Sequence, residues 1–481
     1  MSTFSGLGTA ASGLSAARAA LEVTGQNVAN ANTEGYTRQR VVQSPIAQTT
    51  LATYATQNPY GDGVVVTGIA RLNDAVVDAR VNSTAAASAY WSTAATAAGS
   101  VESALNEPGS NGLTKVLNDF WNDWQQMANN PGSAAIGNTL IAQGRLVGST
   151  LSAGYTAAKD AWTEARGAAA ATVVAINAAA AKVADLNTSI RSLTAAGSNV
   201  NSLLDQRDAA VTTLAKLTGA TTRGNADGTI DVVVGGNALV SGSTSRAVAL
   251  TGAENFSVIA APPLSLVWSG TSPVIPVSLD GGEMAARIAS LQPADTSTPS
   301  TGTGGVFAEA AKAYDDIATS VADKVNALHR QGTTSTGQPG TGGTPLDFFG
   351  FKSTSGPPSQ NLVVVPTSVA GIATADGTKG ALDNTIADTI ALLGSSLDSP
   401  NAAWGTYVSR LGSQVATATA RSTTADTAAT AATTAQNSNS GVDLDEETAN
   451  LVIYQHAYQA SARVISTIND VLDTLINMGA R

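Results

Sequence analysis

The first forty residues of this chain repeat a large aliphatic side chain at every seventh position. The four residues are Leu7, Leu14, Leu21 and Val28. A seven-residue spacing keeps one apolar stripe on one side of a helix, as in a coiled coil. Periodicity alone equally allows an amphipathic helix that docks on its own domain. The stripe is narrow and several glycines weaken the helix in isolation, so the segment predicts a helix that needs a partner.

The last forty residues carry a second stripe. It consists of Leu444, Leu451, Tyr458, Ile465 and Leu472, which again recur at every seventh position. We predict that the two stripes pair in a coiled coil. Each buried aliphatic side chain gains about 1.5–3 kcal/mol, whereas ordering each residue costs about 1–2 kcal/mol. The pair is therefore predicted to be weak or disordered in a single chain and ordered only among neighbouring subunits.

Residue strings at both ends of the chain resemble a known family. Ser-Gly-Leu at 12–14, Asn-Val-Ala-Asn at 27–30 and Asn-Thr-Glu-Gly-Tyr at 32–36 resemble the N-terminal signature of the bacterial flagellar rod, hook and hook-associated proteins. Gly-Val-Asp-Leu-Asp-Glu-Glu at 441–447 resembles the C-terminal signature of the same axial family. The resemblance implies a secreted subunit that leaves the cell through the flagellar type III apparatus.

Three internal strings resemble, within this family, the proteins of the hook–filament junction. They are Leu-Asn-Asp-Phe-Trp at 117–121, Leu-Asp-Gln-Arg-Asp at 204–208 and Asp-Phe-Phe at 347–349. The resemblance implies a structural subunit at the extracellular junction, with neither enzymatic activity nor a cofactor. Its implied partners are copies of itself in a ring or helical layer, the hook protein, a second junction protein on the filament side, and an export chaperone.

The predicted subunit interface combines the two stripes with the loop after the first helix. Asn and Gly tolerate left-handed backbone, so residues 27–36 predict a helix end followed by a shaped loop. This loop is expected to meet the layer below. The predicted interface residues are Leu7, Leu14, Leu21, Val28, Asn30, Asn32, Gly35, Tyr36, Leu444, Leu451, Tyr458, Ile465 and Leu472.

Composition argues against several classes of function. The chain has 481 residues, no cysteine and a formal net charge of −11. Disulfide and thiolate chemistry are therefore excluded, and the acidic balance argues against nucleic-acid and anionic-membrane partners. The N-terminus lacks the basic residues and apolar run of a cleaved signal peptide. The apolar run at 167–181 is too short to span a bilayer.

Between the two ends, apolar periodicity predicts long helices. The cluster Phe120, Trp124 and Met127 lies on one face of a helix and predicts core packing, while a ligand-stacking cluster is the less favoured alternative. Helix-breaking glycine and proline segments, and apolar residues spaced three and four positions apart, predict the main helices at 73–105, 113–129, 133–196, 201–217, 306–330 and 404–436.

The predicted fold is mainly α with a β insert. Residues 1–40 and 440–481 form a terminal coiled-coil axial core. Residues 41–217 and 281–439 form a long-helix body that includes a small β-hairpin within 37–71. Alternating residues and an Asp-Gly turn predict that 218–280 is a small outer β-rich domain.

No residue set in the sequence predicts a catalytic, cofactor or metal site. His329 and His456 have no second histidine in range, and both are interpreted as ordinary surface or interface residues. Asp315 and Asp316 are interpreted as a solvated helix face. The acidic run at 443–447 lacks the spacing of a calcium loop and is better explained as helix capping.

Other functions remain open on the sequence alone. The nearest alternative is another flagellar axial protein, of the hook, distal-rod or flagellin type. A secreted glycan-acting enzyme is a distant alternative, and the β-rich insert could have an adhesin-like role.

Overall fold

The computed structural model describes residues 3–46, 63–258, 262–297, 302–335, 337, 346–380 and 382–479. The described chain is mostly helical with small antiparallel sheets, which confirms the predicted fold class. It forms two compact units. The terminal unit draws on residues 1–86, 177–246 and 426–481, and the central unit on residues 87–176 and 247–425. The boundary between them falls within three helices, α2 (Ala75–Leu105), α4 (Ala134–Ala195) and α10 (Pro400–Ser440).

In its described residues, the terminal unit contains both end helices and six strands. A two-stranded sheet pairs β1 with β2, and a four-stranded antiparallel sheet has the order β3-β4-β5-β6. Its complete elements are α1 (Thr3–Ala29), β1 (Gln39–Pro45), β2 (Val64–Arg71), α5 (Asn201–Thr218), β3 (Thr221–Gly224), β4 (Ile230–Val234), β5 (Asn237–Ser241), β6 (Thr244–Ser245) and α11 (Leu444–Gly479).

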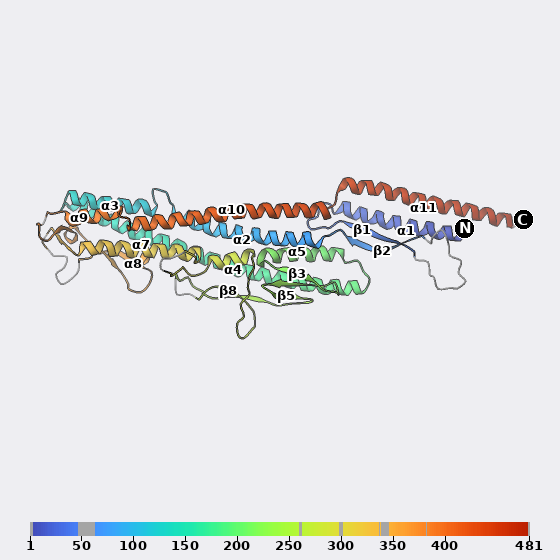
Figure 1. The fold of residues 1–481 in the computed structure, drawn as a ribbon, viewed down its shortest axis with the longest axis horizontal. Coiled ribbons are helices and arrows are strands. Elements are labelled where there is room, and N and C mark those ends of the chain that lie inside the picture. The colour runs from blue at the N-terminus through green and yellow to red at the C-terminus, as the bar shows by residue number, and fades with distance from the viewer. Residues whose placement is uncertain are drawn as a thin grey trace. The chain divides into compact units, whose positions relative to one another are not determined.

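Helices α1 and α11 pack side by side in the terminal unit (Figure 1). A Cβ atom added to Gly6 would lie 3.4 Å from Ile468, and one added to Gly13 would lie 3.3 Å from Ser461. Advancing seven residues along α1 therefore moves seven residues back along α11, so the helices are antiparallel and in a seven-residue register. The predicted pairing of the two end helices is thus present within one chain.

The central unit contains the aromatic core. Phe120, Trp124 and Met127 on α3 (Leu113–Asn129) are fully buried, and Phe120 and Trp124 pack against Phe348 with their rings tilted. The prediction of core packing is confirmed. The other elements that lie wholly in this unit are β7 (Val248–Thr251), β8 (Ser265–Trp268), α6 (Gly282–Ser290), α7 (Val306–His329), β9 (Gly332–Thr334), β10 (Phe349–Phe351), α8 (Pro358–Asn361), β11 (Leu362–Val364), η1 (Val369–Gly371), β12 (Ala373–Asp376), α9 (Thr385–Leu392) and η2 (Leu393–Ser395).

Helix α4 changes the expectation that the apolar run at 167–181 is too short to span a bilayer. The apolar run at 167–181 lies inside this helix of 62 residues, which by length and composition alone is long enough to cross a membrane. Core helices of soluble proteins pass the same test, and α4 buries Leu140, Leu151 and Ile176 completely. A single helix of this kind is therefore weak evidence for a membrane span.

The predicted β insert is divided between the two units. Strands β3 to β6 belong to the terminal unit, and β7 and β8 belong to the central unit, because the division falls between residues 246 and 247. The predicted domain boundaries stay a prediction. The predicted hairpin lies in β1 and β2, and the turn residues Gly61 and Asp62 lie outside the described residues.

Candidate assembly surface

Helix α1 faces α11 with glycine at two positions, Gly6 and Gly13, and the absence of a side chain there allows the two helices to approach closely. Ala10, Ala16, Ala17, Ala20 and Val23 of α1 are buried in the terminal unit, where α1 packs against α11, β1 and β2. The predicted stripe residues Leu7, Leu14 and Leu21 are half-buried beside this contact, and Val28 is exposed.

On α11, the side that meets α1 carries Glu447, Tyr454, Ser461 and Ile468, which are seven residues apart. The predicted residues Ile465 and Leu472 are half-buried near this side. Three others, Leu444, Leu451 and Tyr458, are exposed, the last two with 37% and 38% of their surface accessible. The seam within one chain therefore uses other residues than the stripe at 444, 451 and 458.

On α11, apolar residues lie along both edges of the surface that contacts α1. Leu451 and Tyr458 each precede a contact residue by three positions, whereas Val464 and Val471 each follow one by three positions. Positions three before and three after a given residue lie on opposite sides of it around a helix. Helix α1 thus covers the middle of a wide apolar face and leaves both of its edges exposed.

The end of α11 extends past α1. Because Gly6 lies opposite Ile468, the register leaves the last turns of α11 without an α1 residue opposite them. Figure 1 shows the C-terminal end of α11 running beyond the N-terminal end of α1. Leu475, Ile476 and Met478 in this extension are all more than half exposed.

A buried polar cluster, which we call the joint, fixes the other end of this helix pair. It consists of Asn27, Tyr36, Arg38, Gln39 and Glu447. The Asn27 amide donates to the Gln39 carbonyl at 2.9 Å and to the Glu447 carboxylate at 3.1 Å. Its oxygen accepts from the Tyr36 hydroxyl at 2.9 Å and from the Gln39 backbone N–H at 3.1 Å. Every polar atom of the Asn27 side chain is therefore engaged, which fixes the loop against α11.

Arg38 supplies the charge that Glu447 needs in this buried position. Its Nε lies 2.7 Å from Glu447, whose side chain is 2% exposed, and its NH2 lies 2.8 Å from the exposed Glu446. The hydrogen bond to Glu446 and the fields of both carboxylates raise the pKa of Arg38, against a lowering by burial. Burial also raises the pKa of Tyr36, so its hydroxyl stays a donor to Asn27.

A second polar cluster joins the same loop to α5. Arg71 on β2 pairs with Asp205 at 2.9 Å and with Asp208 at 2.6 Å, and it donates to the Thr37 hydroxyl at 3.1 Å. Asn201 donates to the Gln39 side chain at 2.9 Å. Burial raises the pKa of Asp205, and Arg71 opposes this effect. The string at 204–208 therefore serves to anchor the loop that follows α1.

The predicted loop residues have distinct local roles. Asn30 donates to the Gln26 carbonyl at 3.0 Å at the end of α1 and accepts from Thr33. Gly35 has a φ of +78°, a left-handed conformation that favours glycine. Asn32 and Gly35 are exposed, whereas Tyr36 is half-buried in the joint.

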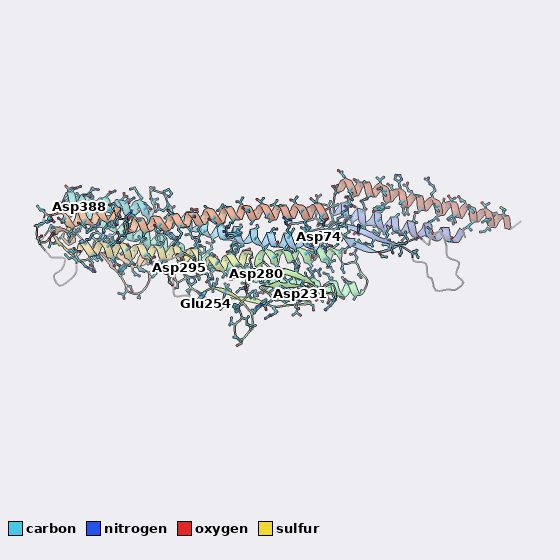
Figure 2. The ribbon with its side chains drawn as sticks, in the orientation of Figure 1. Asp74, Asp231, Glu254, Asp280, Asp295 and Asp388 are labelled. Atoms are coloured by element: carbon cyan, nitrogen blue, oxygen red, sulfur yellow. The ribbon has the colours of Figure 1, made fainter. Side chains whose placement is uncertain are left out.

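The acidic residues of the described chain do not form a metal site. Six of them, labelled in Figure 2, come from separate elements or loops. Within the described ranges, no group of three His, Asp or Glu residues is placed to hold an ion. Asp443 accepts hydrogen bonds from the backbone N–H groups of Asp445 and Glu446, which confirms that it caps α11.

Sequence reasoning missed two features of the charged residues. Asp315 is half-buried and accepts both hydrogen bonds of Ser359, so it is not part of a solvated face, although Asp316 is exposed. The sequence predicts that Glu447 is one of the capping acids, yet it is buried and its partner Arg38 is 409 residues away. The sequence signal for the joint was that three of its members, Asn27, Tyr36 and Glu447, lie inside the strings at the two ends of the chain.

Three family models match this chain. The model of the flagellar hook-associated protein FlgK helical domain matches residues 98–345. The model of the flagella basal body rod protein matches residues 7–37, and the C-terminal model of the flagellar basal body rod FlgEFG protein matches residues 436–478. The two rod models thus cover α1 with its loop and most of α11, while the FlgK model covers the middle of the chain.

Curated relatives match over the full length. Flagellar hook-associated protein 1 of Bacillus subtilis is 27% identical over 510 residues, covering 99% of this chain and 98% of the relative. The protein of the same name from Escherichia coli is 27% identical over 552 residues, covering 98% of this chain and 99% of the relative.

A solved structure shares the fold. The flagellar hook junction protein FlgK from Burkholderia pseudomallei matches with a TM-score of 0.61 and 16% identity, over 74% of this chain and 99% of that chain. Because the FlgK helical-domain model covers more than half of the residues, this chain belongs to the flagellar hook-associated protein FlgK family.

Proposed function

We propose that this chain forms part of the junction between the flagellar hook and filament, and that copies assemble through α1 and α11. Members of this family are structural proteins of the flagellum. The observation that supports the assembly mechanism is the apolar surface of α11 that α1 leaves uncovered.

Assembly by burial follows from the shape of this surface. A helix that is apolar on more sides than its partner covers must bury the rest against something else. Neighbouring copies would cover the two flanks, with Leu451 and Tyr458 on one side and Val464 and Val471 on the other. Burial of apolar surface gains about 25 cal/mol per Å², and repetition around a ring multiplies the gain without any chemical step.

The loop after α1 would make the contact with the adjacent layer. Its exposed residues Asn32 and Gly35 are carried on a backbone held by Asn27 and Tyr36, so the loop presents one fixed shape. We further propose that the partners are other copies, the hook protein, and a second junction protein on the filament side, with an export chaperone before assembly. The proposed location is extracellular, and the proposed role is structural without catalysis.

A gene deletion with complementation tests this function. Deletion should leave hooks without filaments and release filament subunits into the medium. Leu451→Asp places a charge on the exposed flank and should fail to restore filaments, while Gln459→Asp, on the side of α11 away from α1, should restore them. Normal filaments in the deletion strain would contradict the proposed function. Full rescue by Leu451→Asp would contradict only the assembly surface.

The alternative of another axial protein has weaker support. The rod-protein models match only the ends of the chain, whereas residues 98–345 match the hook-associated family. A glycan-acting enzyme is the distant alternative, and none of the three matching family models describes one. Absence of turnover on murein by the purified chain is the expected result.

A further inference from the structure

His329 lies at the end of α7 and is fully buried. Its Nδ1 lies 2.6 Å from the Leu346 carbonyl, and the backbone N–H of Ala373 donates to its Nε2 at 2.9 Å. A carbonyl can only accept and an N–H can only donate. The two contacts together therefore require a neutral ring that carries its proton on Nδ1. The prediction of a surface or interface histidine is wrong for this residue.

The ring connects three separate elements of the central unit. It belongs to α7, it holds Leu346 next to the buried pair Phe348 and Phe349, and it holds the first residue of β12. Asn326, one turn earlier on α7, accepts from the backbone N–H groups of Phe348 and Phe349 at 2.9 and 3.0 Å. Strand β12 in turn pairs with β9, so His329 attaches one strand of this small sheet to the helix.

Few charges face this ring. Asp347 is the charged group whose field acts on it, and Asp347 is already paired with Arg330. Asp376 on β12 accepts from Thr378, and Asp383 accepts from the Asp376 N–H at 2.8 Å. Helix α3 faces His329 with the uncharged Trp124 ring, whose centroid lies 6.1 Å from the imidazole centroid. On α9, the carboxylate of Asp388 already accepts a hydrogen bond from Gln125. A positive charge on His329 would thus have no free carboxylate to compensate it among the described residues.

We infer that His329 forms an acid-sensitive contact, which holds α7, the 346–349 segment and β12 together only while its ring is neutral. Protonation of Nε2 converts the acceptor of the Ala373 N–H into a donor, so two donors then face each other in a dry site. Exposure to water would then lower the free energy of both the unpaired Ala373 N–H and the charged ring, because water can accept their hydrogen bonds. This inference concerns local opening and does not depend on the proposed role at the junction.

The direction of the pH effect follows from linkage. Burial lowers the pKa of His329 below its ordinary value of 6.5, although the Leu346 carbonyl and Asp347 partly oppose this. The closed form is therefore fully stable above pH 6.5 and loses stability as the pH falls from there toward the lowered pKa. An opened form with an ordinary imidazole pKa of about 6.5 would be up to about 30-fold more populated at pH 5 than at pH 7.5, the limit being reached when the closed form stays unprotonated.

The full chain allows a direct test because it has only two histidines. With ¹⁵N-labelled histidine, the imidazole spectrum at pH 7.5 should show one ring, His329, protonated on Nδ1. Amide exchange of Ala373, corrected for the intrinsic effect of pH, should accelerate between pH 7.5 and pH 5, by up to about 30-fold. Exchange at Val240, in the other unit, is the reference and should not change.

Two variants distinguish the loss of the His329 contact from a general loss of stability in acid. His329→Gln keeps a neutral donor and acceptor, so exchange at Ala373 should lose its dependence on pH. His456→Gln removes an exposed ring and should keep the full dependence. Should His329→Gln fail to fold, the wild-type tautomer and exchange data decide alone. An Nε2-protonated ring, a constant Ala373 rate in the wild type, or an unchanged pH dependence in a folded His329→Gln would each overturn the inference.

Discussion

Glu447→Gln is the substitution that most directly tests the joint. The wild-type carboxylate accepts from Arg38 at 2.7 Å and from Asn27 at 3.1 Å. A glutamine amide has one acceptor oxygen and one donor NH₂ group, so at least one of these two donors must face another donor. A hydrogen bond to a charged group is worth about 1.5–3 kcal/mol, and an unsatisfied buried group costs about 1–3 kcal/mol.

The net cost of Glu447→Gln is reduced by the second carboxylate. Arg38 keeps its pair with Glu446 at 2.8 Å, so its charge is not left isolated. We therefore expect a loss of about 2–4 kcal/mol in the stability of the joint. This corresponds to about 30- to 700-fold faster local opening, at tenfold per 1.4 kcal/mol.

Hydrogen exchange by mass spectrometry measures this opening. Peptides that cover β1 and residues 447–460 should exchange faster in Glu447→Gln, and those from the central unit should not change. The matched control is Glu446→Gln, one residue away, whose wild-type side chain is 58% exposed. An exposed pair of this kind is worth about 0.2–1 kcal/mol. Equal acceleration in the two variants would refute the argument that burial makes Glu447 important.

Two further predictions concern packing and order. A Cβ at Gly154 would lie 2.1 Å from the Tyr314 ring, whereas one at Gly167 in the same helix would have no heavy atom within 4 Å. Gly154→Ala should destabilise through overpacking by about 1–3 kcal/mol, and Gly167→Ala should stabilise by up to about 1 kcal/mol. Thermal melts check both, and the reverse order would contradict the close packing. In the isolated monomer, amides of residues 5–30 and 445–475 should exchange faster than those of α3, because neighbouring copies are absent. Strong protection there would show that the terminal helices are stable without assembly.

Helices were largely predictable because their signals are local. The spacing of Phe120, Trp124 and Met127, with a breaker before and a proline after, predicted the helix at 113–129 with the bounds of α3. The pairing of the two end helices could also be predicted, since each carries a stripe that requires a partner. The strands β9, β10 and β12 have only three or four residues each, too few for a periodic pattern.

Long-range polar partners could not be predicted from the sequence. Glu447 is surrounded by other acids at the start of a helix, where capping is the usual explanation, and nothing local indicates a buried arginine partner. The burial of His329 likewise depends on a carbonyl 17 residues away and a backbone N–H 44 residues away. The side of α11 that meets α1 was also ambiguous, because apolar residues occupy several heptad positions of this helix.

The absence of cysteine makes crosslinking the most direct measurement of assembly through α11. The double variants Leu451→Cys/Val464→Cys and Tyr458→Cys/Val471→Cys place one cysteine on each exposed flank, too far apart to join within one helix. The control Gln459→Cys lies on the side of α11 away from α1. In isolated flagella, oxidation should link neighbouring copies of a double variant, while Gln459→Cys and the dilute monomers remain uncrosslinked. Equal crosslinking of Gln459→Cys, or no crosslinking of either double variant in intact flagella, would contradict assembly through the uncovered face of α11.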